Sequence, residues 1–337
     1  MKKLLKILLV TSLGLVLALG GAFLYYQSQL ESTHRGGFLV VESGKSLRQV
    51  AQDLEKAGLI KNAKAFELYA RLQKRSASIQ EGEYEFKEDL DSRAILAKLL
   101  KGERKVKKFT LPEGYRYEQL ARILEKEGIA SYKEAMAAFK SEDYLKKLPF
   151  AAISLEGYVF PDTYYYDSRT KLDQILNRMI DRFLSQINER YQKRLTELGW
   201  TPAEWISLAS IIQKESGQVD EMPLVSSVFH NRLKKGMLLQ SDPTIIYGLE
   251  NFDGNIRRAD ILNPHAFNTY QHSGLPPGPI TNPGLEAMEA ALFPAESDYL
   301  FFVGKGNGTH YFSKDLNKHN QAVRHYQIKG LRTPLKD

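Results

Sequence analysis

The first pattern along the chain is an uncharged apolar stretch near its beginning. Lys2, Lys3 and Lys6 come first, and residues 7–26 then carry no charge. A helix of that length spans ~30 Å, which matches the hydrocarbon core of a bilayer. A cleaved signal peptide is the alternative, but its apolar region is usually shorter and ends in an A-x-A-like site. The pattern therefore favours a retained transmembrane helix at residues 7–26. The basic residues before it predict a cytoplasmic tail at residues 1–6 and an external remainder.

After a polar linker at residues 27–37, one amphipathic pattern occurs twice. Residues 44–59 align without a gap with residues 114–129, and each copy reads as a turn, an amphipathic helix and a glycine that ends it. Identical residues recur at a constant offset, which indicates an internal repeat. They are Gln49 and Gln119, Ala51 and Ala121, Leu54 and Leu124, Glu55 and Glu125, Lys56 and Lys126, and Gly58 and Gly128.

The first copy extends into a longer unit with strands on both sides. Residues 38–41 and 82–86 have strand patterns, and residues 63–74 and 92–100 have helical ones. This strand–helix–helix–strand order resembles a LysM-like module, a kind that docks on glycan chains. We expect the LysM-like module, with its internal repeat, to cover residues 38–147.

The pattern changes after residue 148 and predicts a larger, helix-rich domain at residues 148–335. Helical spacing covers residues 172–198, 201–216, 222–235 and 317–328, and a glycine-rich turn between residues 303 and 309 predicts a hairpin. The fold class is therefore α+β: a transmembrane helix, a small LysM-like α/β module, and a larger helix-rich domain with short β-hairpins.

Composition narrows the possible chemistry. The chain has 337 residues, of which 43% are apolar and 26% charged, as in ordinary globular proteins. It has no Cys, which excludes disulfides, thiolate metal sites and cysteine nucleophiles. The net charge of +7 suits an anionic partner such as a lipid surface or an acidic wall polymer. The basic run at residues 101–108 lacks interleaved aromatic residues, and with the external topology it argues against nucleic acid.

One acidic residue continues the apolar face of a predicted helix. On the helix at residues 201–216, Trp205, Leu208, Ile211 and Ile212 form the apolar stripe, and Glu215 follows at the same spacing. Burial and the negative end of the helix dipole would both favour its protonated form. A carboxylic acid that keeps its proton near neutral pH can act as a general acid. The helical spacing alone leaves two other roles open for Glu215: its side chain could extend into solvent, or it could pair with a nearby basic residue.

Other chemistries find little support in the sequence. There is no H-E-x-x-H, P-loop or G-x-S-x-G motif, and the seven His residues show no metal-like spacing. We therefore expect no metal site and no cofactor. Asp162 and Asp242 both lie beside Pro in turn-like segments, where either could be a second carboxylate or a capping residue.

Several longer motifs resemble the YceG-like family of endolytic murein transglycosylases. They are Ile212-Gln213-Lys214-Glu215-Ser216, Val228-Phe229-His230-Asn231-Arg232-Leu233, the run from Leu239 to Gly248, Asn268-Thr269-Tyr270, and Gly274-Leu275-Pro276-Pro277-Gly278. The resemblance implies a single-pass inner-membrane protein with a periplasmic catalytic domain, and it places the family's catalytic Glu at Glu215.

The resemblance also implies a reaction. Members of the family cut the bond between N-acetylmuramic acid (MurNAc) and N-acetylglucosamine (GlcNAc) within peptidoglycan strands and leave 1,6-anhydro ends, which would limit the length of nascent strands. The expected partners are glycan strands, the inner membrane and the penicillin-binding peptidoglycan synthases.

Candidate substrate-binding residues are Gln240, Asp242, Tyr247, Asn268 and Tyr270, since amides and phenols suit N-acetyl groups and sugar faces. Loop packing is the alternative role for each of them. A hydrolytic muramidase and a non-enzymatic peptidoglycan-binding scaffold are the alternative functions.

Overall fold

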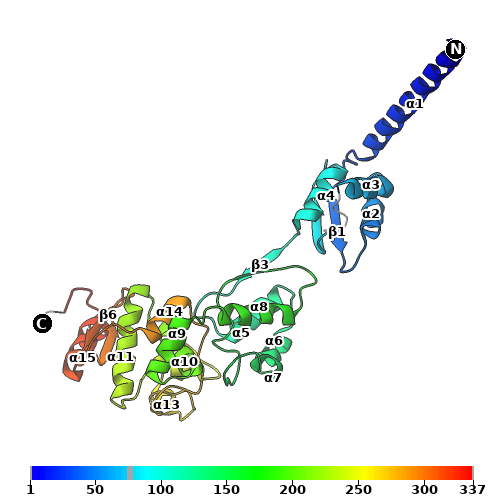
Figure 1. The fold of residues 1–337 in the computed structure, drawn as a ribbon. Coiled ribbons are helices and arrows are strands. Elements are labelled where there is room, and N and C mark those ends of the chain that lie inside the picture. Colours follow the sequence, from blue (N-terminus) through cyan, green and yellow to red (C-terminus); the bar gives the residue numbers. More distant parts are fainter. Residues whose placement is uncertain (1, 74–78, 336–337) are drawn as a thin grey trace. The chain divides into compact units, whose positions relative to one another are not determined.

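The computed structural model describes residues 2–73 and 79–335, and the chain forms two compact units (Figure 1). Unit 1 comprises Met1–Lys107 and Tyr165–Arg169, and unit 2 comprises Lys108–Tyr164 and Thr170–Asp337. The sequence predicts a module boundary at residue 147, whereas the contacts place the second repeat copy in the same unit as most of residues 148–335.

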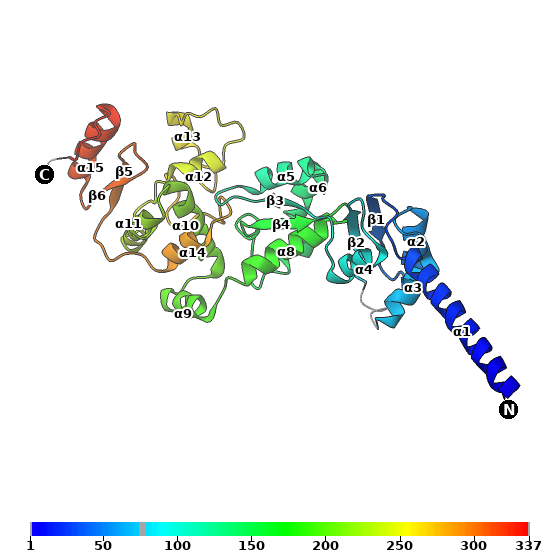
Figure 2. The same ribbon diagram turned by 90° about the horizontal axis from the view of Figure 1, so that it is seen from above.

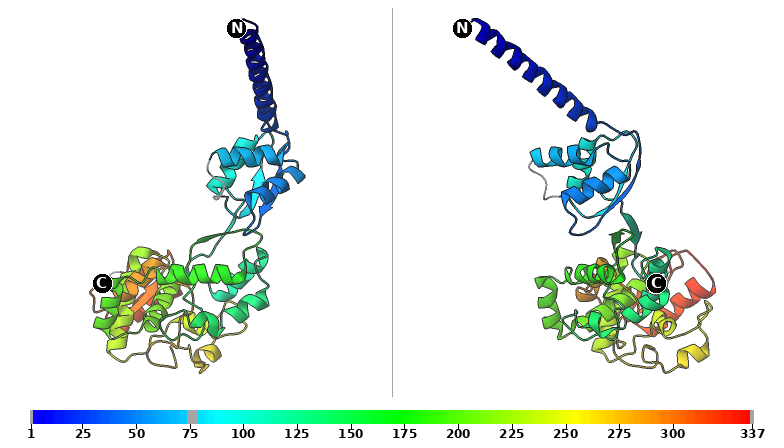
Figure 3. Two further views of the ribbon diagram at one scale, coloured as in Figure 1. Left: turned by 45° about the vertical axis from the view of Figure 1, so that its right-hand side comes forward. Right: turned by 90° about the vertical axis from the view of Figure 1, so that its right-hand side faces the viewer.

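The apolar N-terminal stretch forms one continuous helix, α1 (Lys2–Gln29), which is straight in both views of Figure 3. Its segment Leu9–Gln29 has a mean hydropathy of 1.8 and none of it is buried inside the protein. Length, composition and exposure therefore fit a single membrane-spanning helix, as the sequence predicts.

Unit 1 has the predicted strand–helix–helix–strand order. Strands β1 (Gly37–Val41) and β2 (Gly82–Phe86) pair antiparallel, with Leu39 opposite Tyr84. Between them along the chain lie α2 (Leu47–Lys56) and α3 (Ala63–Leu72), and α4 (Ser92–Lys101) follows. The structure confirms this order, while the likeness to a LysM module stays a prediction.

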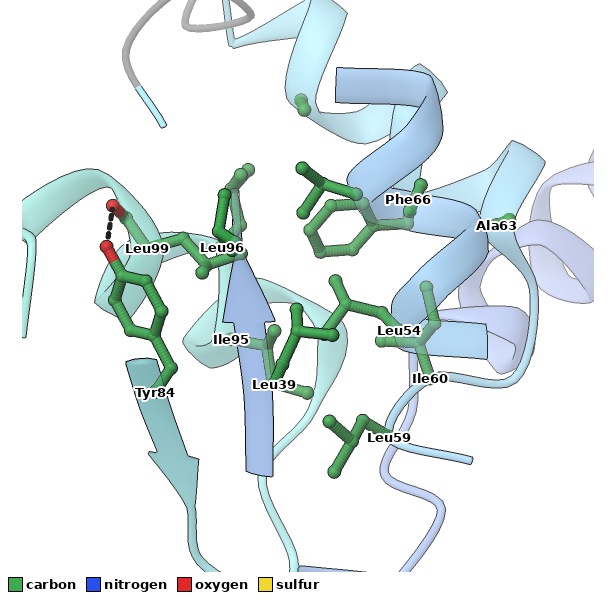
Figure 4. Close-up of a cluster of buried hydrophobic side chains, with 14 of the residues drawn as sticks. Leu39, Leu54, Leu59, Ile60, Ala63, Phe66, Tyr84, Ile95, Leu96 and Leu99 are labelled. Atoms are coloured by element: carbon green, nitrogen blue, oxygen red, sulfur yellow. Dashed lines mark hydrogen bonds between the residues drawn. The ribbon is translucent and has the colours of Figure 1, made fainter. Parts of the chain in front are cut away.

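The core of unit 1 lies between the two-stranded β1–β2 sheet and the helices of the unit (Figure 4). Leu54 from α2, Phe66 from α3 and Leu99 from α4 are fully buried together. The Tyr84 hydroxyl donates a hydrogen bond to the Gln80 carbonyl at 2.7 Å, so this ring is buried without an unpaired polar group. The apolar positions of the first repeat copy therefore build this core.

The second repeat copy opens unit 2. Helix α5 (Tyr117–Lys126) packs on α6 (Tyr132–Ala138), and the short α7 (Glu142–Leu145) follows. A two-stranded sheet joins β3 (Lys107–Thr110) and β4 (Thr163–Tyr166). Leu120, Ala121 and Leu124 are fully buried, as their helical spacing predicts.

The rest of unit 2 is built around one central helix, α10 (Pro202–Glu215), as Figure 2 shows. It packs against α11 (Met222–Lys234), α12 (Asp242–Tyr247) and α14 (Leu285–Leu292). The sequence predicts one apolar stripe on α10, but every residue from Trp205 to Ile212 is buried, because neighbours cover this helix on several sides. The predicted helical region at residues 172–198 forms α8 (Leu172–Leu184) and α9 (Glu189–Leu198).

The C-terminal part of unit 2 contains the predicted hairpin. Strands β5 (Phe301–Gly304) and β6 (His310–Ser313) pair antiparallel and pack on α15 (Leu316–Val323). The predicted last helix continues beyond α15 as one wider turn, η2 (Arg324–Ile328). Two short elements complete the unit, η1 (Val219–Glu221) and α13 (Arg258–Leu262).

Candidate active site

Glu215 opens into a cavity of about 320 Å³ in unit 2. The walls come from the end of α10, from α11, from the loop that leads into α12, and from the β5–β6 hairpin with α15. Two carboxyl groups, Glu215 and Asp242, and one guanidinium, Arg232, line it. The cavity therefore joins groups of opposite charge in a single concave site, as expected for catalysis.

The position of Glu215 follows from how α10 begins and ends. The Thr201 hydroxyl caps the first turn, Pro202 takes the first helical position, and Glu204 closes a capping box, so the helical register is fixed from its first residue. Ser216 then leaves the helix in an extended conformation. Glu215 is thus the last helical residue, held on a buried helix and partly exposed to the cavity.

A hydroxyl group holds the Glu215 carboxyl group in place. The Ser241 Oγ donates a hydrogen bond of 2.6 Å to Glu215 Oε1, and Ser241 itself is only 1% exposed. Its backbone N–H donates to Thr269 Oγ1 at 3.0 Å, and the Thr244 hydroxyl donates to the Ser241 carbonyl at 2.6 Å. This network leaves one carboxyl oxygen, Oε2, for a proton or a substrate.

Burial raises the pKa of Glu215 to about 7. The hydrogen bond from Ser241 opposes that rise because it favours the charged form, as does the positive charge of Arg232. The negative charge of Asp242 adds to the rise. Near neutral pH the carboxyl group is therefore present in both forms, the condition for a single residue to act first as an acid and then as a base.

Asp242 carries the second carboxyl group of the cavity, and Tyr270 fixes it. The Tyr270 hydroxyl donates to Asp242 Oδ1 at 2.6 Å. Burial and this bond both raise the pKa of Tyr270, so the phenol stays neutral and continues to donate. Asp242 is therefore held beside Glu215 as a hydrogen-bonded carboxylate.

Arg232 supplies a fixed positive charge. Its side chain is only 7% exposed, and it donates to the carbonyls of Leu300 and Leu239, each at 2.7 Å. Because these neutral carbonyls satisfy its donors without cancelling its charge, the guanidinium favours the charged form of Glu215.

The wall from the β5–β6 hairpin carries a second acid–base pair. The His310 Nδ1 lies 2.8 Å from Glu221 Oε2, and the His310 backbone N–H donates to the same oxygen at 3.0 Å. Phe301 stacks on His319 with 5.2 Å between the ring centroids. Aromatic faces and polar groups thus alternate along this wall, as suits a sugar surface.

The structure brings some of the predicted site residues together and places others elsewhere. Gln240, Asp242 and Tyr270 line the cavity with Glu215, and Gln240 adopts a left-handed backbone conformation (φ 50°). Asn268 is fully buried, and its Nδ2 donates to the backbone carbonyls of residues 260, 261 and 263. Tyr247 lines a different cavity, described below.

Sequence reasoning passed over Ser241, which bonds to Glu215, and Arg232, which lines the cavity. Ser241 and Arg232 both stand within the motifs quoted above, but neither was singled out. Ser241 lies 26 positions from Glu215 along the chain, so no local pattern indicates their contact. Arg232 reads as a charged residue of an exposed helix face, whereas the cavity wall encloses it.

The sequence of this chain is similar to that of known proteins. The model of the YceG-like family matches residues 39–325. An endolytic murein transglycosylase of Bacillus subtilis is 34% identical over 92% of this chain and 91% of its own length. One from Streptococcus pneumoniae is 28% identical over 84% of this chain, which spans 57% of that longer relative.

A solved structure is also similar. The crystal structure of a YceG-like protein from Listeria monocytogenes matches with a TM-score of 0.59 and 30% identity, over 85% of this chain and 98% of that one.

Proposed function

Because this chain belongs to the YceG-like family, whose curated relatives are endolytic murein transglycosylases, we propose that it cleaves MurNAc–GlcNAc bonds within peptidoglycan strands through Glu215. The observation that carries the proposal is the Glu215 carboxyl group itself. It faces the cavity, accepts a hydrogen bond from Ser241 and has a pKa of about 7.

The first step is proton donation. Glu215 gives its proton to the oxygen that links C1 of MurNAc to GlcNAc, the C1–O bond breaks, and GlcNAc leaves with a new hydroxyl group. Positive charge develops at C1 and the ring oxygen as this bond breaks. The Asp242 carboxylate, held by Tyr270, would stabilise that charge from within the same cavity.

The second step returns the proton to Glu215. The carboxylate left by the first step takes the proton of the C6 hydroxyl of the same MurNAc, and O6 forms a bond with C1. The product has a 1,6-anhydro end, and the acid is regenerated without water. Because the attacking hydroxyl belongs to the substrate, proximity lowers the barrier and no water-activating base is required.

Four of the candidate substrate-binding residues keep that role in the proposal: Gln240, Asp242 and Tyr270 would contact sugar groups in the cavity, and Tyr247 would contact substrate beyond it. Asn268 would take the alternative role and hold the loop that carries Tyr270. Helix α1 would anchor the chain in the inner membrane with residues 1–6 in the cytoplasm and the catalytic domain in the periplasm. The LysM-like module would bind glycan, and cleavage beside penicillin-binding synthases would limit the length of new strands.

The decisive experiment is mass spectrometry of the products that the full chain releases from peptidoglycan strands. We expect anhydro-ended fragments from the wild type and a loss of at least ~100-fold in Glu215→Gln, which keeps the shape of the side chain but cannot transfer the proton. Retained activity in this variant would refute the role of Glu215.

The pH profile tests the same group independently. Since Glu215 must begin protonated, kcat/KM should fall about tenfold per pH unit above about pH 7. Ser241→Ala removes a hydrogen bond that favours the charged form of Glu215. The pKa of Glu215 should therefore rise in this variant, and the fall in kcat/KM should begin at a higher pH. A profile that is flat between pH 6 and pH 9, or one that Ser241→Ala leaves in place, would contradict proton donation by Glu215.

One observation favours a second candidate, a hydrolytic muramidase. Asp242 lies in the same cavity as Glu215 and could activate water, as the second carboxylate of a hydrolase does. Reducing ends in place of anhydro ends would select this function. The non-enzymatic scaffold would be selected by glycan binding without any change in strand length.

A further inference from the structure

A second cavity of about 350 Å³ is lined by residues that adjoin those of the catalytic cavity in the sequence. Lys214 lines the second cavity and the next residue, Glu215, lines the first; Pro243 lines the second and the preceding residue, Asp242, lines the first. The end of α10 and the start of α12 thus separate the two. We call the second space the Arg116–Lys214 cavity, after the two cations that line it.

The side chains that line this cavity differ in charge from those of the catalytic cavity. Among the described residues that line it none is acidic; besides the two cations there are two aromatic side chains, Tyr247 and Phe252, and three aliphatic ones. Lys214 is exposed and has no acidic partner within 4 Å among the described residues. The Arg116–Lys214 cavity therefore has a positive charge and a partly apolar wall.

Arg116 has donors available in this cavity. One of its nitrogens pairs with Glu118 at 2.9 Å, and its guanidinium lies 4.4 Å from the centre of the Tyr247 ring. Its Nε is buried and has no hydrogen-bond partner. This Nε has no accessible surface, so a carboxylate in the cavity would accept from the N–H groups of the guanidinium that line it.

We infer that the Arg116–Lys214 cavity binds a carboxylate on the peptide arm that MurNAc carries. The inference rests on the proposed function, which places a MurNAc ring beside Glu215. Consecutive residues at the end of α10 and at the start of α12 line the two cavities, and three residues of extended peptide reach about 10 Å, so an arm attached at the reacting sugar would reach the neighbouring cavity. The aliphatic and aromatic wall would accommodate the small apolar side chains of that arm.

The same inference explains why an endolytic enzyme would recognise more than sugar. A strand bound only through repeating sugars can slide by one disaccharide, whereas an arm in a charged cavity fixes one MurNAc at the reacting position. The carboxylate contact thus improves binding and register together, and its loss should raise KM more than it lowers kcat.

The test compares three strand substrates of equal length: with acidic peptide arms, with the arm carboxylates converted to amides, and with the arms removed. For the wild-type full chain we expect kcat/KM to be about tenfold higher on acidic arms than on the other two. Lys214→Gln and Arg116→Gln should each reduce this ratio several-fold. The exposed Lys193→Gln on α9 is the matched control and should keep it.

The outcomes separate this inference from the proposed function. Equal cleavage of all three strands by the wild type, with anhydro ends, would overturn the arm-binding inference alone. A preference that Lys214→Gln and Arg116→Gln both leave unchanged would overturn it as well. Absence of cleavage on every strand would remove the proposed function and this inference with it. Because each variant is compared with itself on different strands, an indirect effect on Glu215 cancels in the ratio.

Discussion

The two repeat copies share their local structure and differ in how their helices begin. Helices α2 and α5 have the same length, bury the same four positions and are each preceded and followed by a left-handed glycine. In both, the third-position glutamine, Gln49 or Gln119, accepts a hydrogen bond from the N-cap backbone N–H. The N-cap residue itself is Ser46 in the first copy and Arg116 in the second.

That one difference changes what holds each helix. Ser46 accepts from the Gln49 backbone N–H, as a serine N-cap does. Arg116 has no acceptor in its side chain, and the N–H of the next residue, Tyr117, instead donates to Glu156 Oε1 at 3.0 Å. The buried Glu156 also accepts from Asn282 Nδ2 at 3.2 Å.

In the second repeat copy, Glu156, which is far away in the sequence, accepts a hydrogen bond at the start of the helix. Glu156 accepts from the first N–H of α5, and the Gln119 N–H bonds to the Arg116 carbonyl, so the side chain at position 116 is free from capping and carries a cation that lines a cavity. The first copy keeps its own cap and builds the core of unit 1. The predictions below test this division of roles.

The largest expected effects come from the equivalent core positions. Leu54 and Leu124 are both fully buried, so Leu54→Ala and Leu124→Ala should each lower the free energy of unfolding of their own unit by about 2–5 kcal/mol. Hydrogen exchange should show faster exchange in unit 1 for the first variant and in unit 2 for the second. Faster exchange in both units from either variant would contradict the separate cores.

Much of the fold could be predicted from the sequence because the signals are local. The repeat, its glycines, the Ser-x-x-Gln cap, the capping box at Thr201 and the glycine-rich hairpin each depend on residues a few positions apart. They place the helices and strands within a few residues. The burial of α10 on all sides could not be predicted in this way, because its neighbours come from distant segments.

In the site, too, the features that depend on nearby residues could be predicted, and the contacts between distant segments could not. The predicted helix of residues 201–216 puts Glu215 at its end and on its apolar face, but the helical spacing alone leaves open whether the side chain reaches solvent. The Ser241–Glu215 contact and the hydrogen bond from the start of α5 to Glu156 both join segments far apart in the chain. The second cavity likewise joins Arg116 to Lys214, across almost a hundred residues, so only the three-dimensional structure reveals it.

The next prediction concerns the residue that replaces the missing cap. Glu156→Ala should lower the free energy of unfolding of unit 2 by about 2–3 kcal/mol, since it leaves the buried Tyr117 N–H without its acceptor and removes one of the two acceptors of Asn282 Nδ2. The matched change in the first copy, Ser46→Ala, should cost only about 1 kcal/mol in unit 1. Calorimetry of both variants checks this, and equal losses would contradict the exchange of roles.

The two caps should also differ in their response to pH. Burial raises the pKa of Glu156 well above its ordinary 4.5, although Arg116 opposes the rise. The folded unit 2 therefore binds this proton more tightly than the unfolded chain does. Its stability should fall as pH rises above 4.5, by up to about 1.4 kcal/mol per pH unit, until the pKa of the folded state is passed. Glu156→Gln should remove this fall, and a slope that persists in the variant would exclude Glu156 as its source.

The smallest effects are expected from exchanging the two cap residues, and they test the comparison most directly. Ser46→Arg should lower the stability of unit 1 by about 1 kcal/mol, because the hydroxyl acceptor is lost and nothing replaces it. Arg116→Ser should leave unit 2 nearly unchanged, since a new cap to the Gln119 N–H offsets the lost contact with Tyr247. It should nevertheless reduce the preference for strands with acidic arms. If Arg116→Ser instead destabilises unit 2 by more than about 1 kcal/mol and keeps that preference, Arg116 is a structural residue, and the second copy differs from the first in its packing alone.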